Sequence, residues 1–220
     1  MIEIKYKIKS RLGVFETKDF YTNIKGEIYF FEEEIGYIEA ERTNADHMFD
    51  CNFTLGQVFG LDDSEMQQMS CFFNKEGNWK KSLDKDYDPE EDAFMLKSLY
   101  LYSPFRGVGI GTYALRDIIK IFGKQCGYLI GEAKPLQFFN GTTEINGYDK
   151  LEQDRKKALK SLLKYYKKLG FKQYEKTSKI YFNLNNIGDF DAILEEFPLV
   201  FDELNKRAKK LRAAKEKEST

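Results

Sequence analysis

The chain has few of the residues that build metal sites and catalytic triads. Its 220 residues include one histidine, His47, and three cysteines, Cys51, Cys71 and Cys126. The cysteines form no Cys-x-x-Cys pair, and histidine and cysteine do not occur together at the close spacing of a zinc site. His47 lies in the polar stretch TNADHMFD, away from any Gly-x-Ser-x-Gly signature, so we predict a surface-loop residue. We therefore expect no metal cofactor and no nucleophilic triad.

Excess charge of one sign and long apolar runs are also missing. Lys and Arg total 35 against 36 Asp and Glu, for a formal net charge of −1, so no global field favours nucleic acid or an anionic membrane. No apolar run reaches the length of a membrane-spanning helix. The first residues, MIEIKYK, lack the apolar core of a signal peptide, and the odd number of cysteines suits a reducing compartment. We expect a soluble cytoplasmic protein without a membrane or nucleic-acid partner.

The apolar content is sufficient for one sizeable core. With 42% hydrophobic residues in 220, the chain suits a single domain with appendages. We place that domain at residues 1–188, followed by a helical extension over 189–220 that ends in the basic tail KRAKKLRAAKEKEST. The lysines of residues 156–168 and this tail are predicted to face water, although such clusters also suit nucleic-acid phosphates.

The first half of the chain predicts a strand meander followed by a helix. Residues 2–9 alternate apolar and charged side chains, which is the period of a half-buried strand. Residues 27–32 and 35–42 predict two further strands around a tight acidic turn with Gly36. The segment from about 57 to 91 predicts a helix over LDDSEMQQMSCFF, begun by an aspartate cap, and then a polar surface loop.

The second half alternates strands and helices. The long apolar run AFMLKSLYLY, at 93–102, predicts a central strand. Apolar residues recur at helical spacing over 113–122, and a second helix is predicted over 155–169. YLIGEA, at 128–133, predicts a buried strand between these helices. FKQYEK and KIYFNL, within 171–184, then predict a closing hairpin.

Three glycines, Gly107, Gly109 and Gly111, lie between the central strand and the following helix. The first N–H groups of a helix have no partner within it and carry partial positive charge, so phosphate binds there readily. Glycines would let the loop wrap closely around a pyrophosphate, and Arg106 would add a charged contact. The alternative is a tight turn that only lets the helix pack on the strand.

Two common phosphate-binding motifs compete for this loop. Gly109, Gly111 and Ala114 satisfy G-x-G-x-x-A, and Glu132 ends the next strand, as in a dinucleotide-binding fold. In that fold the strand runs straight into the first glycine, whereas the four residues SPFR intervene here. No Lys-Ser or Lys-Thr follows the glycines, which excludes a P-loop.

The run RGVGIG, from Arg106 to Gly111, matches R/Q-x-x-G-x-G/A, the acyl-CoA pyrophosphate loop of the GNAT acetyltransferase superfamily. LLKYYKKLGFKQY, at 162–174, is similar to the next motif of that family. The two motifs occur in the family's order, and the resemblance covers residues 93–184. It implies an α/β (α+β) GNAT fold, with a mixed, mostly antiparallel sheet, flanking helices and a V-shaped splay between the two middle strands.

The resemblance also implies which residues bind acetyl-CoA. The backbone of Leu101, Tyr102 and Ser103 would pair with the pantetheine arm. The loop amides would hold the pyrophosphate, and they belong to Arg106, Gly107, Val108, Gly109, Ile110, Gly111 and Thr112. Tyr166 matches the tyrosine that protonates the departing thiolate in many members, although a core aromatic is the alternative. Its neighbour Tyr165 does not fall on the family's position.

An amine that is protonated at neutral pH must lose a proton before it attacks a thioester. Glu132 is the first candidate for that base, because it resembles a glutamate on the same strand of the ribosomal-protein acetylating branch. An ordinary strand-end salt bridge is the alternative. Glu39 and Glu41, on one face of an earlier strand, are further candidates.

The chain departs from the family in an insert at about 134–154, where Asn140 and Asn146 cannot be assigned to the family's asparagine. The resemblance predicts an N-acetyltransferase that moves an acetyl group from acetyl-CoA directly to an amine within a ternary complex. The alternative is a non-catalytic module that keeps CoA binding or only the fold. The acceptor is not indicated by the sequence, and a homodimer is compatible with the family.

Overall fold

One seven-stranded sheet organises the computed structural model, which describes residues 1–11, 16–61, 65–83, 91–138, 151–186, 188, 192 and 199–218. The strand order is β1-β2-β3-β4-β5-β7-β6. All neighbouring strands are antiparallel except the central pair β4 and β5, which is parallel. The strands are β1 (Ile2–Ser10), β2 (Tyr21–Phe30), β3 (Glu33–Thr43), β4 (Asp92–Leu101), β5 (Cys126–Glu132), β6 (Lys172–Gln173) and β7 (Lys179–Asn183). The predicted mixed, mostly antiparallel α/β sheet is confirmed.

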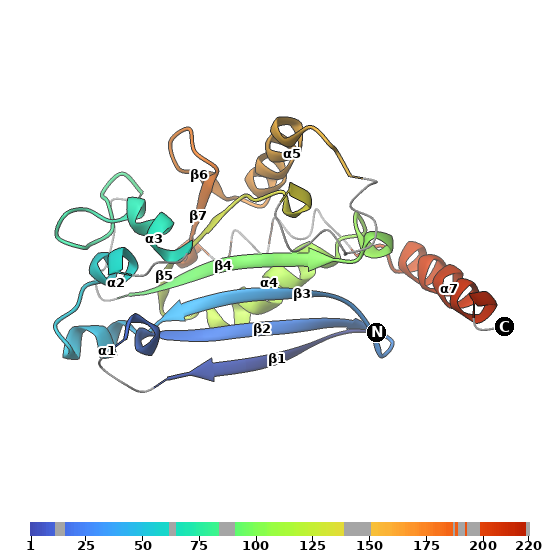
Figure 1. Cartoon of the computed structure of the whole chain (residues 1–220), viewed down its shortest axis with the longest axis horizontal. Helices are drawn as coiled ribbons and strands as arrows, with labels where there is room; N and C mark the ends of the chain where they lie inside the picture. Colours follow the sequence, from blue (N-terminus) through green and yellow to red (C-terminus); the bar gives the residue numbers. More distant parts are fainter. Residues whose placement is uncertain are drawn as a thin grey trace.

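Helices lie on both faces of this sheet (Figure 1). In Figure 1, α4 lies behind the sheet, whereas α1, α2 and α3 gather at one end of it. The α-helices are α1 (Ala45–Asp50), α2 (Leu55–Leu61), α3 (Glu65–Met69), α4 (Ile110–Phe122), α5 (Arg155–Lys168) and α7 (Phe201–Glu218). Short 3-10 turns are η1 (Thr17–Phe20), η2 (Ser70–Phe72), η3 (Ser103–Phe105), η4 (Leu136–Phe138) and η5 (Leu184–Asn186). No described helix is long and apolar enough to cross a membrane.

Alternation along the central strands divides the core between the two faces. Phe94 of β4 and Leu129 of β5 pack with α4 and α5, in a cluster that includes Leu115 and Tyr166. Their neighbours point the other way and pack with α1, α2 and α3 in a separate cluster that includes Met95. Away from bulges, a polar residue of β3, β4 or β5 can therefore be assigned to a face by its position along the strand.

Several local predictions for the first half were wrong. The β2–β3 turn is made by Phe31 and Glu32, which have φ values of 48° and 71°, and Gly36 lies inside β3. His47 lies in the short helix α1, where its amide donates to the Asn44 cap, rather than in a loop. The predicted polar surface loop buries Trp79, which is 2% exposed.

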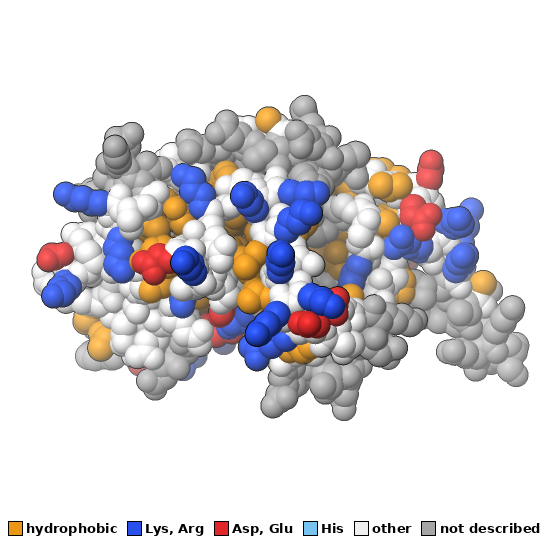
Figure 2. Space-filling view, turned by 90° about the horizontal axis from the view of Figure 1, so that it is seen from above, with side chains coloured by type: hydrophobic (Ala, Val, Ile, Leu, Met, Phe, Trp, Pro, Cys, Tyr) orange, Lys and Arg blue, Asp and Glu red, His pale blue; other side chains and the backbone are white. Residues whose placement is uncertain are grey.

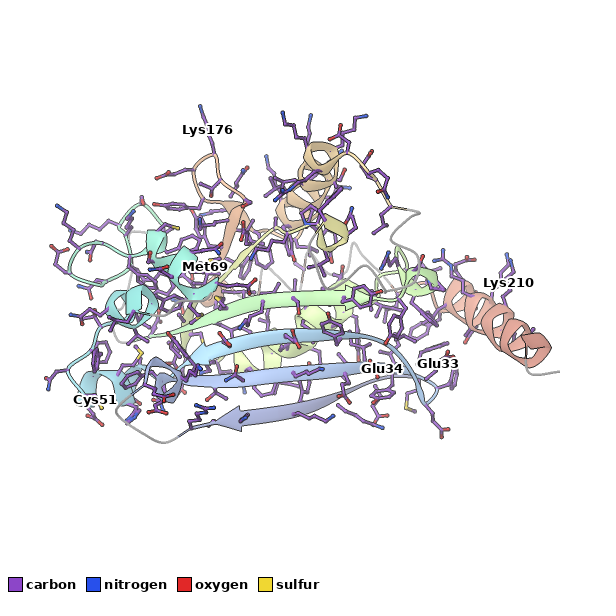
Figure 3. The ribbon with its side chains drawn as sticks, viewed as in Figure 1. Glu33, Glu34, Cys51, Met69, Lys176 and Lys210 are labelled. Atoms are coloured by element: carbon purple, nitrogen blue, oxygen red, sulfur yellow. The ribbon has the colours of Figure 1, made fainter. Side chains whose placement is uncertain are left out.

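The described residues of the predicted helix LDDSEMQQMSCFF belong to more than one element. Its first residue ends α2, its later residues form α3 and η2, and residues 62–64 lie outside the described part of the chain. Met69, labelled in Figure 3, belongs to α3 and is buried. These short helices cover one face of the sheet because their apolar side chains join the same cluster as Trp79.

Gly36 is required for the contact between β3 and β4. An added Cβ would collide with the Tyr100 carbonyl oxygen and lie 2.9 Å from the Leu101 Cα. We expect Gly36→Ala to lower the free energy of unfolding by about 3 kcal/mol, because neither backbone can yield without breaking the strand pairing. Urea denaturation would measure this loss.

Gly60 supplies the matched control. A Cβ there meets no atom within 4 Å, and Gly60 lies in α2. Gly60→Ala should be neutral or stabilising by up to about 1 kcal/mol, because alanine is the better helix former. Equal effects of the two changes would contradict the steric explanation.

Candidate functional site

The two central strands separate halfway along β4. Their parallel pairing runs from Asp92 opposite Cys126 to Leu96 opposite Gly131 and ends there, although β4 continues to Leu101. β5 remains paired with β7 up to Glu132. The described residues therefore contain the splay that the resemblance implies, and we call the space between residues 97–101 of β4 and the end of β5 the gap.

A bulge coincides with the start of the gap. On the other side of β4, Leu96 lies opposite Ala40 and Ser98 lies opposite Glu39, so Lys97 is the extra residue. A bulge bends the strand that carries it and increases its twist. The bend begins one residue after the last β5 partner, which explains why β4 leaves β5 at this point.

The backbone of β4 beyond the bulge alternates between β3 and the gap. The Tyr102 amide donates to Ile35 O at 2.8 Å, on the β3 side. By the alternation of an antiparallel pair, Leu99 and Leu101 then turn their peptide groups toward the gap. Of the three residues expected to meet a pantetheine arm, Leu101 faces the gap, Tyr102 turns its amide away, and Ser103 begins η3.

The glycine loop connects β4 to α4 in the way that an anion site requires. Gly107 and Gly109 have φ values of 74° and 88°, and Gly109 is the N-cap of α4. A Cβ at Gly107 would meet nothing within 4 Å, whereas one at Gly111 would make ordinary contacts from 3.5 Å. The first amides of α4, from Ile110 to Thr112, have no acceptor within the helix. The loop thus combines glycines in the left-handed conformation with the unpaired amide groups of the first turn of α4.

Arg106 lies at the mouth of the gap. Its Nε donates to Leu101 O at 2.7 Å, and its guanidinium lies 5.4 Å from the centre of the Tyr100 ring. Burial raises the pKa of Tyr100, and the charge of Arg106 opposes that rise. The arginine that the sequence suggested for phosphate contact is therefore folded against the end of β4.

α7 supports the loop from outside. Arg207 Nη1 donates to Arg106 O at 2.8 Å and to Pro104 O at 3.2 Å. Leu204 and Ala208 are buried in one cluster with Phe105 and other loop residues. The predicted solvated tail was therefore wrong for Arg207. Leu204 and Ala208, four residues apart on either side of Arg207, could have predicted that this side of the helix is buried.

The adjacent tyrosines of α5 take different positions. Tyr166 is 7% exposed, with its ring 5.2 Å from that of Phe171. The Tyr165 hydroxyl instead lies 2.9 Å from Thr112 Oγ1, at the first turn of α4. Burial raises the pKa of both phenols, most strongly that of Tyr166, so both remain protonated at neutral pH. Tyr165 is the contact between α5 and the loop, and the sequence did not single it out.

The candidate bases lie on the opposite face from Tyr166. Glu132 continues the alternation of Tyr128 and Ile130, which pack toward α1–α3. Its carboxylate accepts from Ser178 Oγ at 2.6 Å and lies 3.1 Å from Lys134 Nζ. The strand-end salt bridge that was the alternative for Glu132 is thus present.

Two further carboxylates share this face near the bulge. Glu39 accepts from Ser98 Oγ at 2.9 Å, and Glu41 accepts from Lys97 Nζ at 2.7 Å. Glu39 and Glu41 thus lie beside the bulge on one face of the sheet, whereas Tyr166 belongs to the core cluster of the other face. The described residues contain no cluster of acidic, histidine and cysteine side chains that could hold a metal ion.

The polar side of α5 faces solvent, as predicted. Its exposed lysines are Lys156, Lys157, Lys160, Lys164, Lys167 and Lys168. Figure 2 shows Lys and Arg side chains gathered on the side of the molecule where α5 lies.

No model of a protein family matches the chain, and no curated protein matches it. Among solved structures, the chain is similar to an N-acetyltransferase from Staphylococcus aureus Mu50, with 13% identity over 79% of this chain and 71% of that one. The TM-score of 0.31 is low.

The contact between Arg207 and the loop can be tested by amide hydrogen exchange. We expect Arg207→Ala to speed exchange of residues 103–112 about tenfold, because two backbone carbonyls lose a charged donor worth roughly 1.5 kcal/mol. Lys210→Ala is the control, since Lys210 is exposed on the same helix and is labelled in Figure 3. Unchanged exchange in Arg207→Ala would show that α7 does not hold the loop.

Proposed function

We propose that this protein is a GNAT-type N-acetyltransferase that binds acetyl-CoA in the gap and transfers the acetyl group directly to an amine. One observation carries this proposal. β4 and β5 part after Leu96 and Gly131, and the freed end of β4 leads directly into a loop of left-handed glycines that caps α4. A split sheet beside an anion-binding helix start suits a ligand with an extended arm and a pyrophosphate.

The loop and the strand would hold different parts of the coenzyme. The amides from Arg106 to Thr112 would donate to the pyrophosphate, helped by the α4 dipole. The peptide groups of Leu99 and Leu101 would pair with the amides of the pantetheine arm, as an added strand pairs with a sheet edge. An arm amide would replace Arg106 on the Leu101 carbonyl and release the guanidinium toward the phosphates.

The transfer requires one proton acceptor and one proton donor. The neutral amine attacks the thioester carbon, a C–N bond forms, and the C–S bond breaks. We assign Glu132 as the group that accepts the ammonium proton, directly or through water, and Tyr166 as the donor to the departing thiolate. The second nitrogen proton, which is lost as the amide forms, returns through water to the Tyr166 phenolate. Glu132 and Tyr166 lie on opposite faces of the sheet. This arrangement suits one proton acceptor and one proton donor, because a thioester in the gap would lie between the two faces.

Acetyl-CoA binding is the first test. Calorimetry should show binding to the wild type and a loss of at least about 100-fold in affinity in Gly109→Asp/Gly111→Asp, because two carboxylates would oppose the pyrophosphate. Gly60→Asp is the matched control, since Gly60 is exposed and a Cβ there meets no atom within 4 Å.

The alternative is a non-catalytic module. A folded wild type that does not bind acetyl-CoA would show that the glycines only allow α4 to pack on the sheet. The proposal would then be overturned and the interaction-module hypothesis would replace it. Binding without turnover of any amine would favour a CoA-binding module.

The role of Tyr166 can be separated from that of Tyr165. Tyr166→Phe should lower kcat about 100-fold with unchanged acetyl-CoA affinity, because it removes only a proton donor. Tyr165→Phe should weaken acetyl-CoA binding a few-fold through the lost Thr112 contact, with a smaller effect on kcat. Thiol release with the best acceptor from an amine panel would measure both, and unchanged kcat in Tyr166→Phe would leave Tyr166 as a core aromatic.

A further inference from the structure

A pocket of about 410 Å³ opens on the sheet face opposite α4. Three of its lining residues, Lys9, Asn23 and Glu41, form one row across β1, β2 and β3, where Lys9 lies opposite Asn23 and Asn23 opposite Glu41. In Figure 1 this face of the sheet is turned toward the viewer, and α4 is behind it. The volume is in the range of small-molecule sites, which run from about 300 to 1,000 Å³.

Cations dominate the rest of the lining. Arg11, Lys18 and Lys97 join Lys9, and Tyr21 completes the wall. Two of these cations already have carboxylate partners, since Arg11 lies 3.4 Å from Glu16 and Lys97 lies 2.7 Å from Glu41. Lys9 and Lys18 form no ion pair with any residue in the described ranges. The pocket thus carries uncompensated positive charge, which favours an anionic group.

The same pocket contains one carboxylate, Glu41, of which a single oxygen accepts a hydrogen bond from a described residue. Glu41 is 8% exposed, and its Oε1 accepts from Lys97. Its Oε2 accepts no hydrogen bond from a described residue. The second carboxylate oxygen can accept a hydrogen bond from an ammonium group. The pocket can therefore bind an anionic group at its lysines and an ammonium group at Glu41.

The pocket adjoins the gap. Lys97, one of its lining residues, is the bulge residue that directly follows the last β4–β5 pair at Leu96. Glu41 lies opposite Met95, one residue before that last pair. A molecule with its ammonium group at Glu41 would therefore have its nitrogen next to the bulge, one strand away from the point where β4 and β5 part.

We propose that this pocket, the acceptor pocket, takes a small amine that also carries a carboxylate or phosphate group. Lys9, Lys18 and Arg11 hold the anionic group, and Glu41 Oε2 holds the ammonium group near the bulge, while Glu132 remains the proton acceptor and is reached through water. The assignment of this ligand as the acetyl acceptor rests on the proposed function, whereas its binding to the pocket does not.

Binding without coenzyme is the first experiment. Calorimetry compares ethanolamine with phosphoethanolamine, and cadaverine with lysine, because the members of each pair differ only in the anionic group. We expect at least one anionic member to bind at least tenfold more tightly than its partner. If neither anionic member binds more tightly than its partner, the proposal is overturned. If only one pair shows the difference in affinity, that pair identifies the preferred anionic group as phosphate or carboxylate.

Matched variants then locate the site. Lys9→Gln/Lys18→Gln should weaken binding of the preferred anionic amine at least tenfold. Lys5→Gln/Lys25→Gln removes the same charge from the same sheet face, where these lysines lie over the rings of Tyr29 and Tyr37, and should leave it unchanged. Equal losses in both variants would reduce the effect to general electrostatics and overturn the assignment.

Kinetics separate this inference from the proposed function. In the full reaction, Lys9→Gln/Lys18→Gln should raise the KM of the anionic amine at least tenfold, with kcat and acetyl-CoA affinity unchanged. One contrary result is that the enzyme acetylates cadaverine as efficiently as lysine, and ethanolamine as efficiently as phosphoethanolamine. That result would overturn the acceptor pocket but support the proposed acetyltransferase activity. If the protein binds anionic amines selectively but does not bind acetyl-CoA, the acceptor pocket is supported and the proposed acetyltransferase function is overturned.

Discussion

The end of the β4–β5 pairing is the constraint on which the rest of the site depends. Two strands in a parallel pair continue together unless one of them bends away or ends, and here β4 bends at its bulge and β5 ends at Glu132. The bulge at Lys97 bends β4 away, while β7 keeps β5 paired as far as Glu132. Close packing holds the last pair in place, because an added Cβ at Gly131 would lie 3.0 Å from Leu96 O. The gap therefore opens at a fixed residue.

This separation places different chemistry on the two sides of the sheet. The face that carries α4 and α5 has the buried Tyr166, the half-buried Tyr165 and the start of α4. The other face carries Glu39, Glu41 and Glu132, each already engaged by Ser98, Lys97 or the Lys134–Ser178 pair. A reaction in the gap would have protonated phenols on one side and hydrogen-bonded carboxylates on the other. Alternation along a strand produces this division without any special loop.

The glycine loop is held at both ends by elements far apart in the sequence. β4 fixes its start through pairing with β3, and α7 contacts its outer side through Arg207 and a small apolar cluster. Tyr165 of α5 contacts its far end at Thr112. A loop with left-handed glycines has high conformational freedom when isolated. Its shape in the fold is therefore set mainly by these three supports.

Local features were predictable because they depend on residues close together in the chain. The alternating residues of β1, the apolar period of α4 and α5, and the glycine loop were all evident from the sequence. The short helix α1 and the burial of Trp79 were missed, since six helical residues give little periodicity and a tryptophan in a polar run gives none. The sequence alone determined the order of elements and the loop chemistry. Only the tertiary structure brought Arg207 to Arg106, Tyr165 to Thr112 and Lys97 to Glu41, because those contacts join segments 101, 53 and 56 residues apart, and the entropy of closing such loops is offset only when the whole sheet forms.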